Sequence, residues 1–198
     1  MFYIIFCFLE LLGELTNKQK LIKYTKPLLI PTLYLELLYY NHHIPPIILI
    51  GILCSTLGDI ILLWRKQLAY FLAGILLFMG TQLSYSLYFY INTSQKCNVF
   101  LLAVTIYITQ IILFKIISDI QNILLKFLVI IYTIMVAFMF YTSILINNNY
   151  IILGSSLFVI SDSMLGLNID KNYKYQNLYN ALIMVTYMSG QYLILYNI

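Results

Sequence analysis

Two aspartates, Asp59 and Asp162, lie inside long apolar runs of the sequence. An ionisable side chain is rare there, because it costs about 2.5 to 3.5 kcal/mol at the centre of a membrane helix even on a mild scale. Asp59 lies six residues before Arg65, and Asp162 lies eight residues before Asp170. On helices these spacings place the two aspartates about 9 and 12 Å in from a polar boundary. We therefore expect two carboxyls at similar depth in an apolar interior.

Two carboxyls that share an apolar cavity are suited to acid–base chemistry. Burial disfavours the charged form of a carboxyl, and one charge disfavours a second charge nearby. One carboxyl can therefore stay protonated and act as an acid while the other is ionised and acts as a base. The same pair would also suit a proton-coupled transport site, so it does not by itself select an enzyme.

Each acidic residue also has a structural interpretation. Asp59 could extend to the interface and pair with Arg65 or Lys66. That interpretation is weaker for Asp162, because no basic residue follows it within two helical turns. Glu36 could make an interhelical hydrogen bond or belong to a site. Two further carboxyls in the first apolar run are expected to pair locally and are left outside the site, namely Glu10 and Glu14.

The composition defines the environment of these residues. Apolar residues make up 62% of the 198 positions and charged residues only 9%, against roughly 25% charged in an ordinary soluble domain. So few polar side chains cannot cover a soluble globule, and we predict an integral membrane protein. The net charge of +4 is scattered between apolar runs, which argues against a nucleic-acid partner. No spacing of cysteine, histidine or carboxylate residues indicates a metal or a cofactor.

Apolar runs between polar breaks predict an all-α, polytopic membrane helix bundle of about eight transmembrane helices. About 20 residues per helix leave roughly five per connection, so residues 1–198 form a single transmembrane domain. The first run, with 16 residues before Asn17, is short for a full crossing. The expected spans cover residues 1–16, 27–40, 45–64, 67–91, 98–117, 122–146, 150–168 and 176–197.

The basic residues indicate the orientation of this bundle. Ten of the eleven fall in or beside the odd-numbered loops, and only Lys96 falls in an even one. This asymmetry predicts cytoplasmic odd-numbered loops and places both termini outside or in the lumen. The membrane would be the endoplasmic reticulum in a eukaryote or the inner membrane in a bacterium. The ten residues are Lys18, Lys20, Lys23, Lys26, Arg65, Lys66, Lys115, Lys126, Lys171 and Lys174.

The sequence contains a candidate internal repeat. Gly51 precedes Asp59 by eight residues in the third span, and Gly154 precedes Asp162 by eight in the seventh. Gln82 in the fourth span and Gln191 in the eighth extend the correspondence loosely. Helices four apart would correspond in two parallel four-helix halves, as in some transporters. Coincidence is as good an explanation of so few matches.

Several segments, in order along most of the chain, resemble the YhhN-like lysoplasmalogenases, integral membrane hydrolases with eight expected helices. The first matching segments are Lys26-Pro27-Leu28, residues 57–62 (LGDIIL) and residues 132–137 (YTIMVA). Stronger matches come later, at Gly154 to Phe158 followed by residues 161–165 (SDSML), and at residues 186–191 (TYMSGQ). Each segment is short, and their order and spacing carry the resemblance.

The resemblance implies cleavage of the vinyl ether bond of a lysoplasmalogen, which releases a fatty aldehyde and glycerophosphoethanolamine or glycerophosphocholine. Protonation of the β carbon would give an oxocarbenium ion that water captures, a demand similar to that of glycoside hydrolysis. We expect Asp59 and Asp162 to be this catalytic pair and Lys26 to bind the phosphate of the lysophospholipid. The other substrate-binding candidates are Gln82, Tyr85, Ser161, Tyr187 and Gln191. Surrounding membrane lipids are the remaining expected partners.

One departure from the family pattern concerns Gln82. The family commonly has a histidine three residues before a tyrosine in the fourth helix, and this chain has Gln82 before Tyr85. Glutamine can hydrogen bond but cannot carry a proton at neutral pH. If the histidine is catalytic in the family, this chain would be a lipid-binding member without activity. If the histidine only orients the substrate, glutamine could suffice. The remaining alternative is a proton-coupled small-molecule transporter.

Overall fold

The computed structural model describes residues 2–93, 95, 98–118, 120–167 and 175–198, without the side chains of Ile112 and Phe114. Asp170, from which the depth of Asp162 was counted, lies outside the described residues. So do three lysines of the charge asymmetry, Lys96, Lys171 and Lys174. Within the described ranges the regular elements are all helices, which confirms the all-α fold class. The α-helices are α1 (Phe2–Thr16), α2 (Gln19–Thr25), α3 (Leu29–Tyr39), α4 (Pro46–Ile61), α5 (Leu68–Asn92), α6 (Val99–Ile117), α7 (Ile123–Leu145), α8 (Asn149–Leu167) and α9 (Gln176–Tyr196). Two short 3-10 helices, η1 (Lys26–Leu28) and η2 (Leu62–Trp64), lead into α3 and follow α4.

Eight of these helices correspond to the eight expected spans, and α2 is additional. Within the described chain, five have the length and composition of membrane-crossing helices, namely α4 with η2, α5, α6, α7 and α8. Helices α1 and α3 have 15 and 11 residues, lengths of about 22 and 16 Å against a hydrocarbon core of about 30 Å. Helix α9 has 21 residues but is less apolar.

Helix α2 occupies a stretch that the hydropathy pattern assigns to a loop. Asn17, with a positive φ of 54°, ends α1 in the left-handed conformation that asparagine tolerates at a helix end. The chain then folds back, and Ile22 of α2 packs where Gly13 of α1 has no side chain. Local turn chemistry, which a hydropathy window does not read, produces this extra helix.

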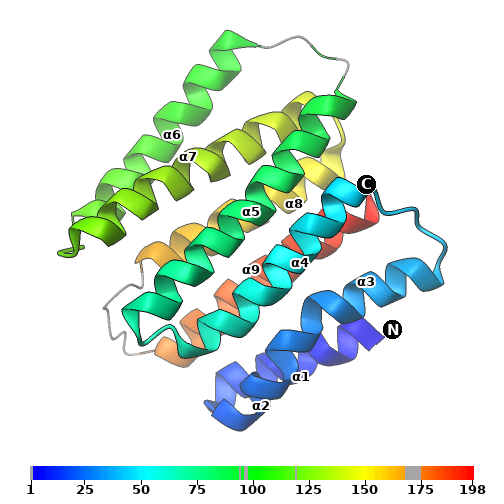
Figure 1. Cartoon of the computed structure of the whole chain (residues 1–198), viewed down its shortest axis with the longest axis vertical. Helices are drawn as coiled ribbons and strands as arrows, with labels where there is room; N and C mark the ends of the chain where they lie inside the picture. Colours follow the sequence, from blue (N-terminus) through cyan, green and yellow to red (C-terminus); the bar gives the residue numbers. More distant parts are fainter. Residues whose placement is uncertain (1, 94, 96–97, 119, 168–174) are drawn as a thin grey trace.

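Successive crossings alternate in direction, and the start of α1 and the end of α9 lie at the same end of the bundle (Figure 1). The most extensive contacts join α4 to α5, α8 to α9 and α5 to α7. Helices α1 and α3 pack along α9 on one side, while α6 forms the opposite edge against α7 and α8 (Figure 1). The main core runs between α3, α4, α5, α8 and α9.

The described odd-numbered connections lie together at the end of the bundle drawn at the lower left in Figure 1. These connections carry Lys18, Lys20, Lys23, Lys26, Arg65 and Lys66, and Lys115 and Lys126 flank the turn between α6 and α7. We call it the basic end. Which side of the membrane the basic end faces stays a prediction from the charge asymmetry.

Two glycines bring the backbones of α8 and α9 into direct contact. A Cβ added at Gly154 would lie 2.9 Å from the carbonyl oxygen of Gly190, and a Cβ at Gly190 would lie 2.8 Å from that of Gly154. Small residues allow such approach between membrane helices, where van der Waals packing replaces the hydrophobic effect as the driving force. This contact fixes α8, and with it Asp162, against α9.

The two segments of the candidate repeat pack in equivalent ways. A Cβ at Gly51 would meet Ser84 and Tyr85 of α5. If Gln82 is aligned with Gln191, these two positions correspond to Leu193 and Ile194 of α9, and a Cβ at Gly154 would meet both of those. At this position the pair α4 and α5 packs as the pair α8 and α9 does. The division into two parallel halves stays a prediction.

Candidate active site

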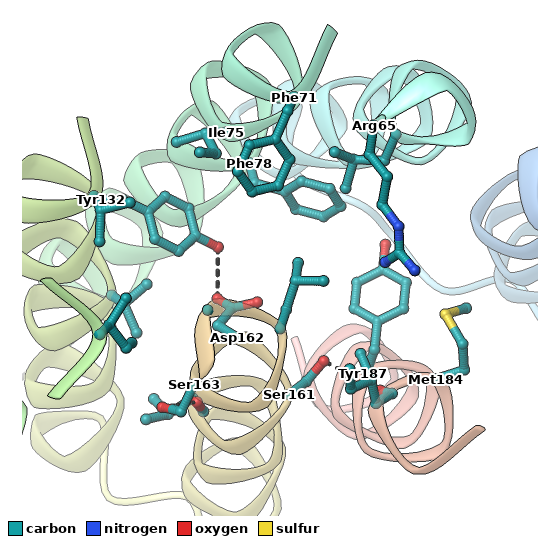
Figure 2. Close-up of a pocket in the computed structure, with 18 of the residues that line it drawn as sticks. Arg65, Phe71, Ile75, Phe78, Tyr132, Ser161, Asp162, Ser163, Met184 and Tyr187 are labelled. Carbon is teal, nitrogen blue, oxygen red and sulfur yellow. Dashed lines mark hydrogen bonds between the residues drawn. The ribbon is translucent and has the colours of Figure 1, made fainter. Parts of the chain in front are cut away.

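A cavity of about 110 Å³ lies between the helices near the basic end. Its wall is formed by residues of α1, η1, α4 to α9 and η2, so both halves of the sequence contribute. On the α5 side the wall is apolar, with Phe71, Ile75 and Phe78 facing the cavity (Figure 2). The volume is sufficient for several water molecules, each of which occupies about 30 Å³ in the liquid.

Asp162 enters this cavity from α8 and is held by two neutral donors from other helices. The hydroxyl of Tyr132, on α7, donates to its Oδ2 at 2.6 Å (Figure 2). The Nε2 of Gln82, on α5, donates to the same oxygen at 3.3 Å. The carboxyl is half-buried and lines the cavity. Both donors can stabilise negative charge on this oxygen.

Asp59 lines the same cavity from α4 and is almost fully buried, with 2% of its surface exposed. The hydroxyl of Tyr187, on α9, donates to its Oδ2 at 2.8 Å. The rings of Phe78 and Phe158 pack edge-on against Tyr187, with centroid distances of 5.9 and 5.6 Å. The partner of Asp59 is therefore a tyrosine fixed in the core, where the structural interpretation of the sequence expected Arg65 or Lys66.

Charged side chains lie at the part of the cavity nearest the basic end. The wall includes Glu14, Lys26 and Arg65, and η1, which carries Lys26, packs against α4 and α1. Arg65 is directed toward the cavity from the end of η2, and its side chain is exposed (Figure 2). Lys26 is thus placed near the carboxyls, as a phosphate-binding residue would need to be.

Glu10 has a more central place than the sequence suggested. It is completely buried, and one carboxyl oxygen accepts a hydrogen bond from the hydroxyl of Thr25. The other oxygen, Oε1, has no hydrogen-bond partner among the residues that the structure describes. Sequence reasoning left Glu10 out in favour of a local pair, although its position inside an apolar run was the signal that could have identified it. Glu36, the other uncertain carboxyl, accepts from the backbone N–H of Tyr3 and lies outside the cavity wall.

The other candidate residues divide into two groups. Ser161 lines the cavity, but its hydroxyl donates to the backbone oxygen of Ile183 and so joins α8 to α9. Tyr85 and Gln191 lie outside the cavity wall and pair with each other, the tyrosine hydroxyl donating to Oε1 of the amide at 2.7 Å. Both are fully buried, and they join α5 to α9 behind the site.

Tyr132 is the site residue that sequence reasoning did not select. It was quoted only as part of a matching segment, yet it makes the shortest described hydrogen bond to either aspartate. The chain has 19 tyrosines, so one more tyrosine in an apolar run gave no signal of its own. Only the packing of α7 against α5 and α8 brings it to Asp162.

Buried carboxyls that line a cavity with room for water are suited to acid–base chemistry. Two carboxyls from different halves of the chain line one cavity that has room for water, and each has one oxygen held by a tyrosine. The second oxygen of each carboxyl is then the one placed to exchange a proton. Among the described residues, no group of three or more histidine, cysteine or carboxylate side chains is arranged to hold a metal ion.

No curated protein and no solved structure matches the chain. A family model does match it, that of the YhhN family, and the match takes in residues 21–198. It contains both aspartates, Tyr132 and Tyr187, while α1 up to Thr16 lies before its start. Because the match covers nearly the whole sequence, the chain belongs to the YhhN family, which includes lysoplasmalogenases.

Proposed function

We propose that this membrane protein hydrolyses the vinyl ether bond of lysoplasmalogens. The observation that carries the proposal is that Asp59 and Asp162 line one cavity with room for several water molecules. Each carboxyl accepts a hydrogen bond from a tyrosine hydroxyl. Membership of the YhhN family supports the choice of substrate.

Different surroundings suggest different roles for the two carboxyls. The cation Lys26 lies on η1, which packs against α4, the helix of Asp59, whereas the described hydrogen-bond donors of Asp162 are neutral. A nearby cation stabilises a charged carboxylate, so we place the base at Asp59 and the acid at Asp162. As Asp162 loses its proton in the transition state, the donors on its Oδ2 strengthen their interaction with the developing charge.

The reaction proceeds in two stages, formation of a hemiacetal and its collapse. In the first, Asp162 transfers its proton to the β carbon, the carbon attached to oxygen becomes an oxocarbenium ion, and the charged Asp59 stabilises it. Water then adds to this carbon and gives a proton to Asp59, which leaves a hemiacetal. In the second stage, Asp59 returns that proton to the ether oxygen, the carbon–oxygen bond breaks, and Asp162 takes the hydroxyl proton. The aldehyde leaves, and both carboxyls regain their starting state.

The size of the cavity limits how the lipid binds. At about 110 Å³ it is smaller than the roughly 300 to 1,000 Å³ that enclose a drug-sized ligand. The hydrocarbon chain must therefore lie among apolar helix surfaces or in the bilayer, with only the reacting bond inside. Helix α6, at the edge of the bundle, contributes Thr109 and Ile116 to the wall, so a chain that enters from the membrane could pass beside it. The phosphate would lie toward Lys26.

The proposal is tested by giving purified protein lysoplasmenylethanolamine and measuring the release of fatty aldehyde. We expect release by the wild type and a loss of about 10²-fold to 10⁴-fold in Asp59→Asn and Asp162→Asn, the usual contribution of a general acid or base. Glu36→Gln is the matched control, because it neutralises a carboxyl outside the cavity wall. Undiminished release by both aspartate variants would refute the mechanism.

The substitution of glutamine for the family histidine gives a second test. Gln82 contacts Asp162 directly, so a histidine at this position would place an ionisable group beside the acid. If this chain binds lipid without cleaving it, the wild type will release no aldehyde and Gln82→His will gain activity. If the glutamine suffices, the wild type will be active.

A transporter remains the alternative class, and the equivalent packing of Gly51 and Gly154 favours it. Two parallel repeats with carboxyls between them are found in some secondary transporters. Proton-dependent uptake into liposomes, with no aldehyde formed from any vinyl ether lipid, would select this function over hydrolysis.

A further inference from the structure

The cavity reaches the edge of the bundle beneath α6. This helix forms the outer layer on its side of the molecule and packs against α7 and α8 (Figure 1). Thr109 and Ile116 of α6 nevertheless belong to the cavity wall, together with residues of α7 and α8. Because α7 and α8 lie between α6 and the rest of the wall, these two side chains reach the cavity through the gap between those helices. The cavity therefore extends between α7 and α8 as far as α6.

Helix α6 separates this part of the cavity from the surrounding bilayer. The side of α6 that faces away from Thr109 carries large, exposed apolar side chains, namely Val104, Tyr107, Ile108 and Ile111. Within the described chain, α6 is also the least buried of the five helices that are long and apolar enough to cross a membrane. In a bilayer these side chains contact lipid tails, which are as apolar as leucine. One layer of helix thus lies between the hydrocarbon of the membrane and the cavity.

A contact between Ile116 and Gly166 closes the gap. Ile116 is buried, and its Cδ1 lies 2.8 Å from the position that a Cβ would take at Gly166 of α8. The isoleucine therefore occupies the notch that the glycine leaves in α8. Gly166 follows Asp162 by four residues, about 6 Å along the helix, and both line the cavity. The contact thus lies about one helical turn from the proposed acid.

The surroundings of this contact suit a hydrocarbon chain. Ile116 belongs to an apolar cluster with Val129 of α7, and Leu113 and Leu167 pack against that cluster. The hydroxyl of Thr109 bonds backbone oxygens of its own helix, so it needs no further partner in the gap. Ile116 also lies in the last turn of α6, at the basic end. A lipid can therefore keep its polar headgroup at the membrane surface while its chain passes between α7 and α8.

We propose that the gap between α7 and α8 is the binding site for the hydrocarbon chain of a lipid that enters from the bilayer, and that Ile116 is its gate. When Ile116 leaves the notch of Gly166, the chain takes its place and the reacting bond comes to Asp162. This inference rests on the proposed function for the reaction. It adds the route of entry and the two residues that control it.

The first test locates the chain without requiring cleavage. The probe is a 1-O-alkyl lysophospholipid, which has no vinyl ether bond, with a photoreactive diazirine in its chain. It is added to the protein in liposomes, and mass spectrometry locates the labelled peptides after illumination. We expect labelling of residues 109–117 and 159–167 that an excess of the same lipid without diazirine suppresses. Suppressible labelling confined to the exposed faces of other helices would overturn the site.

A reversible cross-link tests the gate. In Ile116→Cys combined with Gly166→Cys, the two cysteines are within reach of a disulfide, because the γ carbons of Ile116 lie 3.5 and 3.6 Å from the position of a Cβ at Gly166. We expect oxidation to abolish the suppressible labelling and a reductant to restore it, and this recovery excludes misfolding as the cause. The native cysteines are first replaced by alanine, namely Cys7, Cys54 and Cys97.

The chain offers a matched control for this cross-link. A Cβ at Gly80 of α5 would lie 2.9 Å from Sγ of Cys54 on α4, and 3.5 Å from its Cβ. Gly80→Cys, with Cys54 kept and the other native cysteines replaced, therefore joins two helices away from α6. Oxidation of this variant should leave the labelling unchanged, and Ile116→Ala, which widens the gap, should increase it. An equal loss in both cross-linked variants, or a loss in neither, would overturn the gate.

Aldehyde release distinguishes this inference from the proposed function. Suppressible labelling that the cross-link controls, in a protein that releases no aldehyde, supports the entry site and refutes the hydrolase. Aldehyde release that continues at the full rate after oxidation of the variant with Ile116→Cys and Gly166→Cys overturns the entry site alone.

Discussion

The hydrogen bond from Tyr132 to Asp162 gives the most informative single substitution. Tyr132→Phe removes a hydroxyl 2.6 Å from the carboxyl of the proposed acid and keeps the ring. This bond strengthens as charge develops on Asp162, and a hydrogen bond to a charged group is worth about 1.5 to 3 kcal/mol. Because each 1.36 kcal/mol is tenfold in rate, we expect kcat to fall by about tenfold to 150-fold, with little change in KM.

Two further variants calibrate this effect. Gln82→Met removes the longer bond of 3.3 Å to the same oxygen, and we expect a smaller fall in kcat, of about twofold to tenfold. Tyr85→Phe is the control, since it removes a fully buried tyrosine hydroxyl that bonds Gln191 outside the cavity wall. The assay follows aldehyde release over a range of lysoplasmenylethanolamine concentrations. Equal losses of kcat in Tyr132→Phe and Tyr85→Phe would refute the reasoning, and so would a change in KM alone.

Two predictions concern stability in detergent, measured by thermal unfolding. Gly154→Ala places a methyl group 2.9 Å from the backbone oxygen of Gly190, and we expect a loss of about 1 to 3 kcal/mol; an unchanged Tm would show that α8 and α9 can separate without cost. Thr25→Val removes the described hydrogen bond to the buried Glu10, and we expect a loss of about 1 to 3 kcal/mol. Thr32→Val is its control, because that hydroxyl bonds only the backbone of its own helix, and a similar loss in both would count against a special role for Glu10.

Hydropathy was sufficient to locate the helices, because a bilayer imposes long apolar segments on any chain that crosses it. It could not find α2, which depends on the left-handed conformation of Asn17 and on the space left by Gly13. It also gave no measure of how far α1 and α3 fall short of a full crossing, since their ends are set by turns at residues 17 and 40.

The candidate site was predictable to the extent that charge is rare in this sequence. Asp59 and Asp162 could be selected because few ionisable residues lie in apolar runs, and the structure brings both to one cavity. The same rule would have kept Glu10, which was set aside for a local pair that the buried Thr25 contact replaces. Tyr132 could not be selected by this rule, since tyrosine is abundant in the chain and only tertiary packing distinguishes one tyrosine from another.

The central claim is that Asp162 protonates the β carbon of a vinyl ether with Asp59 beside it. The most direct measurement is hydrolysis of lysoplasmenylethanolamine in D₂O, with the aldehyde trapped as it forms and its deuterium content determined by mass spectrometry. The account predicts one deuterium on carbon 2 of each aldehyde from the wild type, and release at least about 10²-fold slower from Asp162→Asn. Aldehyde without deuterium on carbon 2, or release at the wild-type rate by Asp162→Asn, would contradict it.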